Sequence, residues 1–215
     1  MKILITAGPT HEPIDPVRFI GNHSTGKMGI AIAEEFAKAG DEVILVKGAT
    51  SLNPSNNSIK QIAVETAAEM FEACAQYFSS AEVIVFAAAV ADYTPKFPST
   101  TKIKKKEEEF SIELLKTKDI ALELGKQKRG NQIVVGFALE TNDEEQNAIE
   151  KLKKKNFDFI VLNSMRDEGA GFKNDTNKVT IIDKVGNATK FELKSKEEVA
   201  KDIVAFVNQI LKKRL

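Results

Sequence analysis

The sequence predicts an α/β protein built on a mostly parallel, doubly wound sheet. Apolar runs of strand length alternate with amphipathic runs of helix length, which is the pattern of repeated βαβ units. The run Val83–Val90 is apolar throughout, as expected of a strand buried on both faces of a parallel sheet. A long loop, Thr6–Gly29, separates the first apolar run from the first helix, and this order opens nucleotide-binding folds. The predicted fold is therefore Rossmann-like.

The other elements follow from hydrophobic periodicity and from helix-end signals. Further strands are expected at Ile3–Ile5, Glu42–Val46, Ile59–Val64, Gln132–Ala138 and Phe157–Leu162. Helices are expected at Gly26–Lys38, Thr66–Ser80, Lys118–Lys128, Glu144–Lys155 and Lys196–Leu211. Gly40 is a natural C′ residue for the first helix, and Thr66 with Glu69 forms a capping box for the second.

Two segments are expected to leave the parallel pattern. A glycine-rich loop, Gly169–Phe172, precedes a hairpin of Lys178–Asp183 and Ala188–Leu193, which we place antiparallel at one edge of the sheet. Residues 93–117 contain the charge run 102–109 and a strand at Phe110–Leu115, and we expect them to form an arm that projects from the sheet. The whole chain, residues 1–215, is then a single domain.

Composition excludes several classes of function. Lys plus Arg equals Asp plus Glu at 31 each, so no overall charge favours nucleic acid or an acidic membrane. The single cysteine, Cys74, excludes an internal disulfide and is typical of a reducing cytosol. Met1 lies one residue from the first strand, so we expect a cytoplasmic protein with no leader and no membrane span. His11 and His23 have no cysteine beside them, which argues against a zinc site.

The opening loop has the composition of a phosphate-binding loop. Glycines let backbone N–H groups approach a ligand, hydroxyls next to a helix start can cap the helix or donate to an anion, and cations add charge. These residues are Gly8, Gly21, Gly26 and Gly29, then Ser24 and Thr25, then Arg18 and Lys27. The predicted nucleotide-binding residues of this loop are Gly8, Ser24, Gly26, Lys27 and Met28.

Two common nucleotide motifs fit this loop poorly. Gly21–Met28 has the P-loop spacing, but Met28 stands where a Ser or Thr hydroxyl would hold magnesium. The dinucleotide fingerprint is incomplete, and the second strand runs into Lys47 and Gly48 rather than into a ribose-binding acid. Both motif interpretations are therefore weakened. A nicotinamide-dependent reductase and a non-catalytic nucleotide-binding protein on the same fold stay open as alternative functions.

Other unusual residues follow the ends of later strands. The small residues Ala87–Ala89 and then Asp92 end the fourth strand and predict a pocket floor. The segment Phe137–Thr141 follows the fifth strand, and Asn163 follows the sixth. Because ligands bind outside the carboxyl ends of parallel strands, we expect all of these to meet the opening loop on one side of the sheet. Lys102 and Lys104 are two residues apart, so in an extended arm their side chains lie on the same face and could turn toward a polyphosphate.

Six motifs together resemble the bacterial, CTP-dependent phosphopantothenate–cysteine ligase family over nearly the whole chain. They are Ile5–Thr10, Ile14–Arg18, Asn22–Gly29, Ala88–Tyr93, Lys102–Lys105, and Gly136-Phe137 with Glu140-Thr141. The resemblance implies an acid–amino-acid ligase of coenzyme A biosynthesis. CTP would activate 4′-phosphopantothenate as an acyl-cytidylate, and the amine of L-cysteine would then displace CMP.

The resemblance also implies roles for individual residues. Asn22 would hydrogen-bond the acyl-cytidylate, and Lys102 would neutralise charge growing on the α-phosphate. The implied nucleotide contacts are Ala87, Ala88, Ala89, Asp92, Lys102, Leu115, Lys116, Thr117, Lys118, Phe137, Lys151 and Lys155. Mg²⁺ would accompany the triphosphate, held mainly by phosphates and water.

The family resemblance further implies partners. Many bacterial members are fused to a flavin-dependent decarboxylase, whereas this chain begins on the first strand, so we expect a stand-alone ligase whose product passes to a separate decarboxylase. The family is dimeric, with the arm reaching across, and Phe110–Leu115 is the candidate contact. Lys116–Asp119 departs from the Lys-Asn-Pro-Asp often found there.

Overall fold

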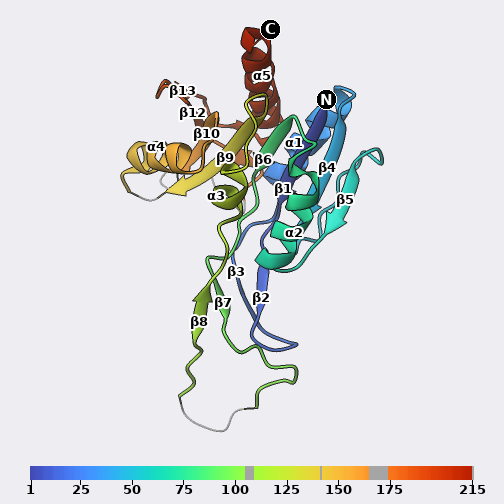
Figure 1. Ribbon diagram of the computed structural model, residues 1–215, viewed down its shortest axis with the longest axis vertical. Helices are drawn as coiled ribbons and strands as arrows, with labels where there is room; N and C mark the ends of the chain where they lie inside the picture. The colour runs from blue at the N-terminus through green and yellow to red at the C-terminus, as the bar shows by residue number, and fades with distance from the viewer. Residues whose placement is uncertain (105–108, 141, 165–173, 215) are drawn as a thin grey trace.

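The central feature of the computed structural model is an eight-stranded sheet in the order β13-β12-β10-β9-β6-β1-β4-β5 (Figure 1). The structure describes residues 1–104, 109–140, 142–164 and 174–214. The strands are β1 (Lys2–Ala7), β4 (Glu42–Lys47), β5 (Lys60–Ala63), β6 (Val83–Phe86), β9 (Ile133–Glu140), β10 (Phe159–Ser164), β12 (Val179–Asp183) and β13 (Ala188–Lys190). Predictions that concern Lys105, Lys106, Glu107, Glu108, Thr141 and Gly169–Phe172 fall outside the described residues.

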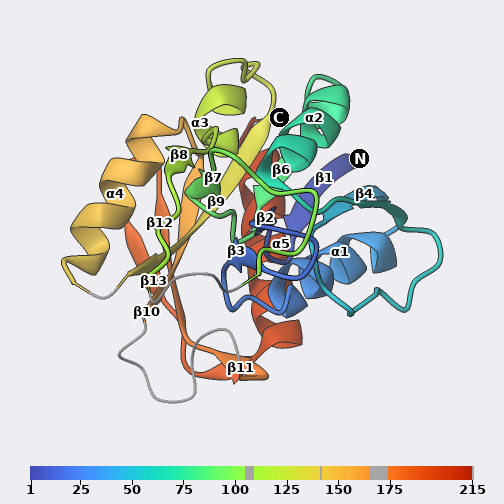
Figure 2. The same ribbon diagram turned by 90° about the horizontal axis from the view of Figure 1, so that it is seen from below.

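The sheet is parallel except at one edge, where β12 and β13 run antiparallel, as the sequence predicts. Helices cover both faces. They are α1 (Lys27–Lys38), α2 (Ala67–Phe78), α3 (Ile120–Gly125), α4 (Glu144–Lys154) and α5 (Lys196–Arg214). Seen along the arm, α2 and α3 lie on one side of the sheet and α1 and α5 on the other (Figure 2).

Alternation of side chains along the strands divides the core into two clusters. Ile5, Val135 and Val161 pack with α1 and α5, whereas the intervening Ile84 and Ile160 pack with α2, α3 and α4. Because successive strand residues point to opposite faces, a sheet buried on both sides needs the continuous apolar strands seen in the sequence. The doubly wound α/β prediction is confirmed.

Helix-end signals were read correctly at the start of α2 and the end of α1, and wrongly at the starts of α1 and α3. Thr66 and Glu69 form the capping box of α2, and Gly40 follows α1 with φ +86°. Ser24 and Thr25, predicted as possible caps of α1, do not cap it: the N-cap is Gly26, with no side-chain cap. The third helix is shorter than predicted at both ends. Asp119, placed in its first turn by the sequence, is instead its N-cap and accepts a hydrogen bond from Leu122 N at 3.1 Å, and the helix ends at Gly125 rather than at Lys128.

The predicted strand Val83–Val90 ends at Phe86, so its extent was wrong. Beyond Phe86 the backbone turns to the loop that follows β1: Ala88 N donates to Thr6 Oγ1 at 3.1 Å and Ala89 N donates to Gly8 O at 2.9 Å. Continuous strand pairing ends at Phe86, and beyond it Pro9 and Ala89 form an isolated parallel bridge. An apolar run alone does not show where continuous pairing stops.

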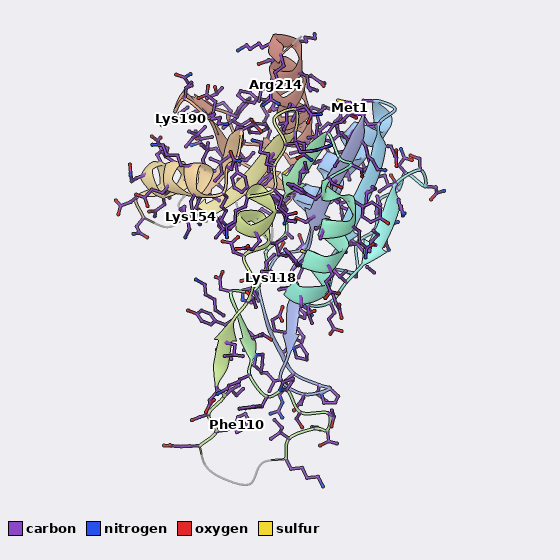
Figure 3. All side chains as sticks on the ribbon, viewed as in Figure 1. Met1, Phe110, Lys118, Lys154, Lys190 and Arg214 are labelled. Atoms are coloured by element: carbon purple, nitrogen blue, oxygen red, sulfur yellow. The ribbon has the colours of Figure 1, made fainter. Side chains whose placement is uncertain are left out.

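The predicted arm is present and projects from the sheet (Figure 1). It contains an antiparallel pair, β7 (Tyr93–Pro95) and β8 (Leu114–Lys116), so the strand predicted at Phe110–Leu115 is shorter and shifted toward the sheet. The opening loop forms a second pair beside it, β2 (His11–Pro13) and β3 (Phe19–Gly21), which the sequence did not reveal. Phe110 lies near the far end of the arm and Lys118 at its junction with the sheet (Figure 3).

A last short pair, β11 (Thr176–Asn177) and β14 (Lys194–Ser195), leads into α5. Among the described residues no helix combines the length and apolarity that a bilayer crossing requires.

Candidate active site

A cavity of about 470 Å³ opens at the carboxyl ends of β1, β6, β9 and β10, which is within the range of small-molecule sites. Its lining joins segments far apart in the sequence. The opening loop and α1 contribute Asn22, Ser24, Thr25, Gly26, Lys27, Met28 and Gly29; the end of β6 contributes Phe86–Val90 and Asp92. The arm junction, α3 and α4 contribute Lys116–Ala121, Lys151 and Lys155; β9, β10 and the last elements contribute Phe137–Leu139, Asn163, Asn177 and Lys196.

Asn22 is held at the end of β6 by its side-chain amide. Nδ2 donates to the carbonyls of Ala89 and Val90, each at 3.1 Å. These two bonds orient the amide group and leave Oδ1 on the opposite side. The alanines Ala87–Ala89 carry little side-chain bulk, so a ligand can lie close to the backbone between Asn22 and the sheet.

The first turn of α1 supplies amide donors and a cation. Gly26 begins the helix with φ +78°, and the first N–H groups of a helix have no partner within the helix. Ser24 Oγ accepts from Gly26 N at 3.3 Å, which shapes the loop rather than the helix end. Lys27 forms an ion pair with Asp175, and this ammonium holds the pKa of the Asp175 carboxyl below its usual range. An anion at this helix end would meet both the amides and Lys27.

The opposite side of the cavity is lined with lysines whose charges already have partners. Lys155 Nζ lies 3.1 Å from Asp119, and Lys151 Nζ lies 2.5 Å from Glu140. Lys118 Nζ lies 3.9 Å from the centre of the Phe71 ring. Ion pairs of this kind fix lysine side chains in place, so they can donate to a neutral base or ribose without a large excess of positive charge.

The base of the arm is tied to the rim of the cavity. Thr117 N donates to Asp92 O at 2.9 Å, and Thr117 Oγ1 donates to Ala91 O at 2.6 Å. The strand of the arm therefore returns to the sheet beside Asp92, which places Lys116, Thr117 and Lys118 at the cavity as the sequence predicts.

A buried carboxylate fixes the chain next to Lys102. The side chain of Asp15 is fully buried; it accepts from Ile103 N at 3.1 Å and from Arg18 Nε at 3.0 Å. Arg18 in turn donates to Ile103 O at 3.0 Å. The paired guanidinium keeps the pKa of the Asp15 carboxyl far below its usual range. Both backbone groups of Ile103 are thus held by the opening loop.

Comparison with known proteins identifies the family. Residues 1–211 match the family described as DNA/pantothenate metabolism flavoprotein C-terminal domain. The chain belongs to this family. A Bacillus subtilis relative, coenzyme A biosynthesis bifunctional protein CoaBC, is 46% identical over 202 residues, covering 94% of this chain and 50% of that protein. A relative from an unknown prokaryotic organism, named cysteine/cysteine sulfinic acid decarboxylase, is 56% identical over 203 residues, covering 94% of this chain and 56% of that protein.

The family fold is confirmed by a solved structure. The crystal structure of the C-terminal domain of coenzyme A biosynthesis bifunctional protein CoaBC is 42% identical, with a TM-score of 0.83, over 99% of this chain and 96% of that one. The chain spans about half the length of the curated relatives that it matches.

Three residues predicted to contact the nucleotide do not line the cavity: Gly8, Lys102 and Leu115. Gly8 lies behind it, where φ +82° and the bond from Ala89 N to Gly8 O shape the floor. Lys102 lies on the arm with an exposed side chain, and Leu115 is 49% exposed on β8. Their roles stay predictions.

The structure also adds cavity residues that the sequence analysis missed. Asn177 and Lys196 reach the cavity from β11 and the start of α5, and Met70 and Phe157 close its inner side. Lys196 was visible only as the first residue of a predicted helix. No motif marks these positions, because their approach to the cavity depends on how α5 packs against α1.

Proposed function

We propose that this chain is a phosphopantothenate–cysteine ligase that uses CTP in coenzyme A biosynthesis. The observation that carries the proposal is one cavity shared by Asn22, the amides of α1, the small residues Ala87–Ala89 and a lysine-lined side. The relatives named for coenzyme A biosynthesis, and the solved C-terminal domain of one such protein, support it.

The proposed reaction has two steps. The carboxylate oxygen of 4′-phosphopantothenate attacks the α-phosphorus of CTP; the new P–O bond forms as the bond to pyrophosphate breaks. The amine of L-cysteine then attacks the acyl carbon, the bond to CMP breaks, and the amine loses a proton. All bonds form between substrates, so the protein's work is positioning and charge stabilisation, which suits a site without a protein nucleophile.

Residues on different sides of the cavity are assigned to the nucleoside and to the acyl-cytidylate. Asp92, Ala87–Ala89, Phe137 and the pairs Lys151–Glu140 and Lys155–Asp119 hold the nucleoside. The oriented amide of Asn22 contacts the acyl-cytidylate through Oδ1, because its Nδ2 is already bonded to two carbonyls.

The proposed Mg²⁺ would neutralise phosphate charge and orient the triphosphate. Asp92 and Asp119 are the carboxylates among the described lining residues, and Asp119 already caps α3 and pairs with Lys155. This small donor set fits an ion bound mainly through phosphates and water.

We also propose a homodimer formed through the arm, in the cytoplasm. Large apolar side chains are exposed along the arm and the neighbouring β3: Phe19 at 51%, Tyr93 at 52%, Phe97 at 75%, Phe110 at 61% and Leu115 at 49%. Such a concentration of exposed apolar residues is typical of a protein–protein interface. The arm of each copy, anchored at Ile103 by Asp15 and Arg18, would carry Lys102 to the α-phosphate.

The test is pyrophosphate release. Purified protein is mixed with Mg²⁺ and CTP, then with 4′-phosphopantothenate, and finally with L-cysteine. We expect pyrophosphate on addition of the acid, and CMP with the amide product on addition of cysteine. ATP in place of CTP is the nucleotide control. No release from either nucleotide, together with tight binding of NADPH, would favour a reductase instead.

A further inference from the structure

Lys118 is held at the rim of the cavity by a different kind of contact from the lysines of α4. Its ammonium nitrogen lies over the Phe71 ring, 3.9 Å from the ring centre, whereas the α4 lysines of the cavity are paired with carboxylates. Within the described part of the chain no carboxylate pairs with Lys118. An aromatic face attracts a cation without neutralising it. Lys118 therefore keeps its full positive charge beside the cavity.

The backbone on both sides of Lys118 is fixed. On one side Thr117 N donates to Asp92 O at 2.9 Å and Thr117 Oγ1 donates to Ala91 O at 2.6 Å. On the other side Asp119 is the N-cap of α3. Lys118 lies between them, at the junction of the arm with the sheet (Figure 3). The direction of its side chain is therefore the remaining freedom, and the Phe71 ring sets it.

Phe71 itself is placed to act on a ligand only through Lys118. It is half-buried on α2 and packs on the core cluster that α2 covers. The residue before it, Met70, lines the cavity, whereas Phe71 is not among the described lining residues. The ring thus presents one face to the ammonium and has its other contacts in the core.

An ammonium held in this way is prepared to donate to an acceptor in the cavity. Lysine has three N–H donors, and those that do not face the ring are directed away from it. A long lysine side chain loses rotamer freedom when it binds a ligand, and a side chain that is already restricted loses less. The proline often found at this position of the family pattern has neither a charge nor a side-chain donor, so the contact is a property of this chain.

We propose that Phe71 is a positioning residue for the nucleotide: its ring holds the Lys118 ammonium at the rim of the cavity, where Lys118 donates to an oxygen of the bound nucleotide. The inference rests on the proposed ligase function, in which CTP occupies this side of the cavity. It gives a role in substrate binding to a residue of α2 that touches no substrate.

The decisive variant is Phe71→Leu, because leucine keeps an apolar contact with the core and removes the aromatic face. Loss of the cation–π contact should raise the Kd and the KM for CTP by roughly 2- to 30-fold, with kcat and the KM for 4′-phosphopantothenate within about twofold of the wild type. Phe71→Tyr keeps the aromatic face and should bind CTP like the wild type. Lys118→Met should weaken CTP binding at least as much as Phe71→Leu, and the double variant should bind no more weakly than Lys118→Met.

A second cation–π contact on α2 provides the matched control. Lys60 Nζ lies 4.8 Å from the centre of the Tyr77 ring, and neither residue is among the described residues that line the cavity. Tyr77 is half-buried on the same core cluster as Phe71. Tyr77→Leu should lower Tm at least as far as Phe71→Leu, because it also removes the hydrogen bond that Lys60 Nζ donates to the Tyr77 hydroxyl. It should leave the Kd for CTP unchanged.

Equal weakening of CTP binding in Phe71→Leu and Tyr77→Leu would show that binding follows stability. Unchanged binding in Phe71→Leu or in Lys118→Met would show that the ring or the ammonium has no part in it. Each of these results overturns the proposal. Titration calorimetry with Mg²⁺ and CTP alone separates this question from the reaction: a wild type that binds CTP and releases no pyrophosphate contradicts the proposed function, whereas the Kd values still decide the role of Phe71. A wild type that binds no CTP contradicts both.

Discussion

Replacing Gly26 by alanine tests whether the shape of the cavity affects the rate of turnover independently of the stability of the fold. Gly26 begins α1 with φ +78°, a conformation that costs a residue with a Cβ about 1–2 kcal/mol. In a chain of this size each kcal/mol lowers Tm by roughly 2–4 °C. Gly40, at the other end of α1, has φ +86° and nothing within 4 Å of an added Cβ. Gly40→Ala therefore carries the same backbone strain without new contacts.

Gly26→Ala adds contacts at the cavity. Its Cβ would lie 3.1 Å from Gly8 N, 3.2 Å from Gly8 Cα and 3.3 Å from Thr50 Cγ2, tighter than ordinary contact with a backbone that shapes the floor. The first turn of α1 or the Gly8 backbone must move. Because displacements of about 1 Å at a reacting site can cost about 100-fold in rate, we expect kcat/KM for CTP to fall roughly 10- to 100-fold in Gly26→Ala only.

Thermal unfolding and pyrophosphate release measure the two effects on the same preparations. Gly26→Ala should lower Tm at least as far as Gly40→Ala, because it adds close contacts to the same backbone strain, and Gly40→Ala should keep its turnover. Equal losses of kcat/KM in the two variants would show that the rate follows stability. Wild-type turnover in Gly26→Ala would show that the turn between Gly8 and α1 does not shape the nucleotide site.

Four further predictions concern the site and the arm. Asn22→Asp replaces the amide donor that bonds the carbonyls of Ala89 and Val90 by a carboxylate oxygen, which those carbonyls repel. The side chain should then lose its orientation toward the acyl-cytidylate, and this nucleotide adduct should accumulate. Failure to detect an adduct by mass spectrometry would contradict this prediction. Lys102→Gln should abolish most turnover, and normal turnover would refute its role. Asp15→Asn should lower Tm by the same amount from about pH 6 to 8, and its Tm should approach that of the wild type below about pH 4. The reason is that the pKa of the Asp15 carboxyl is depressed only in the folded state, so the stability it contributes is lost as the carboxyl is protonated. A Tm difference that persists in acid would contradict the ion pair with Arg18. Leu115→Glu, at an exposed arm position, should shift sedimentation to the monomer with little change in Tm, and an unchanged sedimentation coefficient would place the interface elsewhere.

The sequence by itself determined the architecture and the side of the sheet that carries the site. Apolar runs buried on both faces require helices on both sides, and parallel strands bring their carboxyl ends to one edge. Asn22, Ala87–Ala89, Asp92 and Phe137 therefore could be assigned to one cavity from their places in the chain, and they line it. Lys151, which also lines it, was assigned only through the family resemblance. The end of β6 at Phe86 could not be read, because Ala87–Val90 is as apolar as the strand before it.

Tertiary structure alone decided which residues complete the cavity. Lys27 meets Asp175 across 148 positions of sequence, and Lys196 joins them only because α5 packs on α1. The tertiary structure also places Lys102 on the arm, where Asp15 and Arg18 hydrogen-bond to the neighbouring residue Ile103. Periodicity reports which face of an element is buried, whereas the partner of that face depends on packing between elements far apart in the chain.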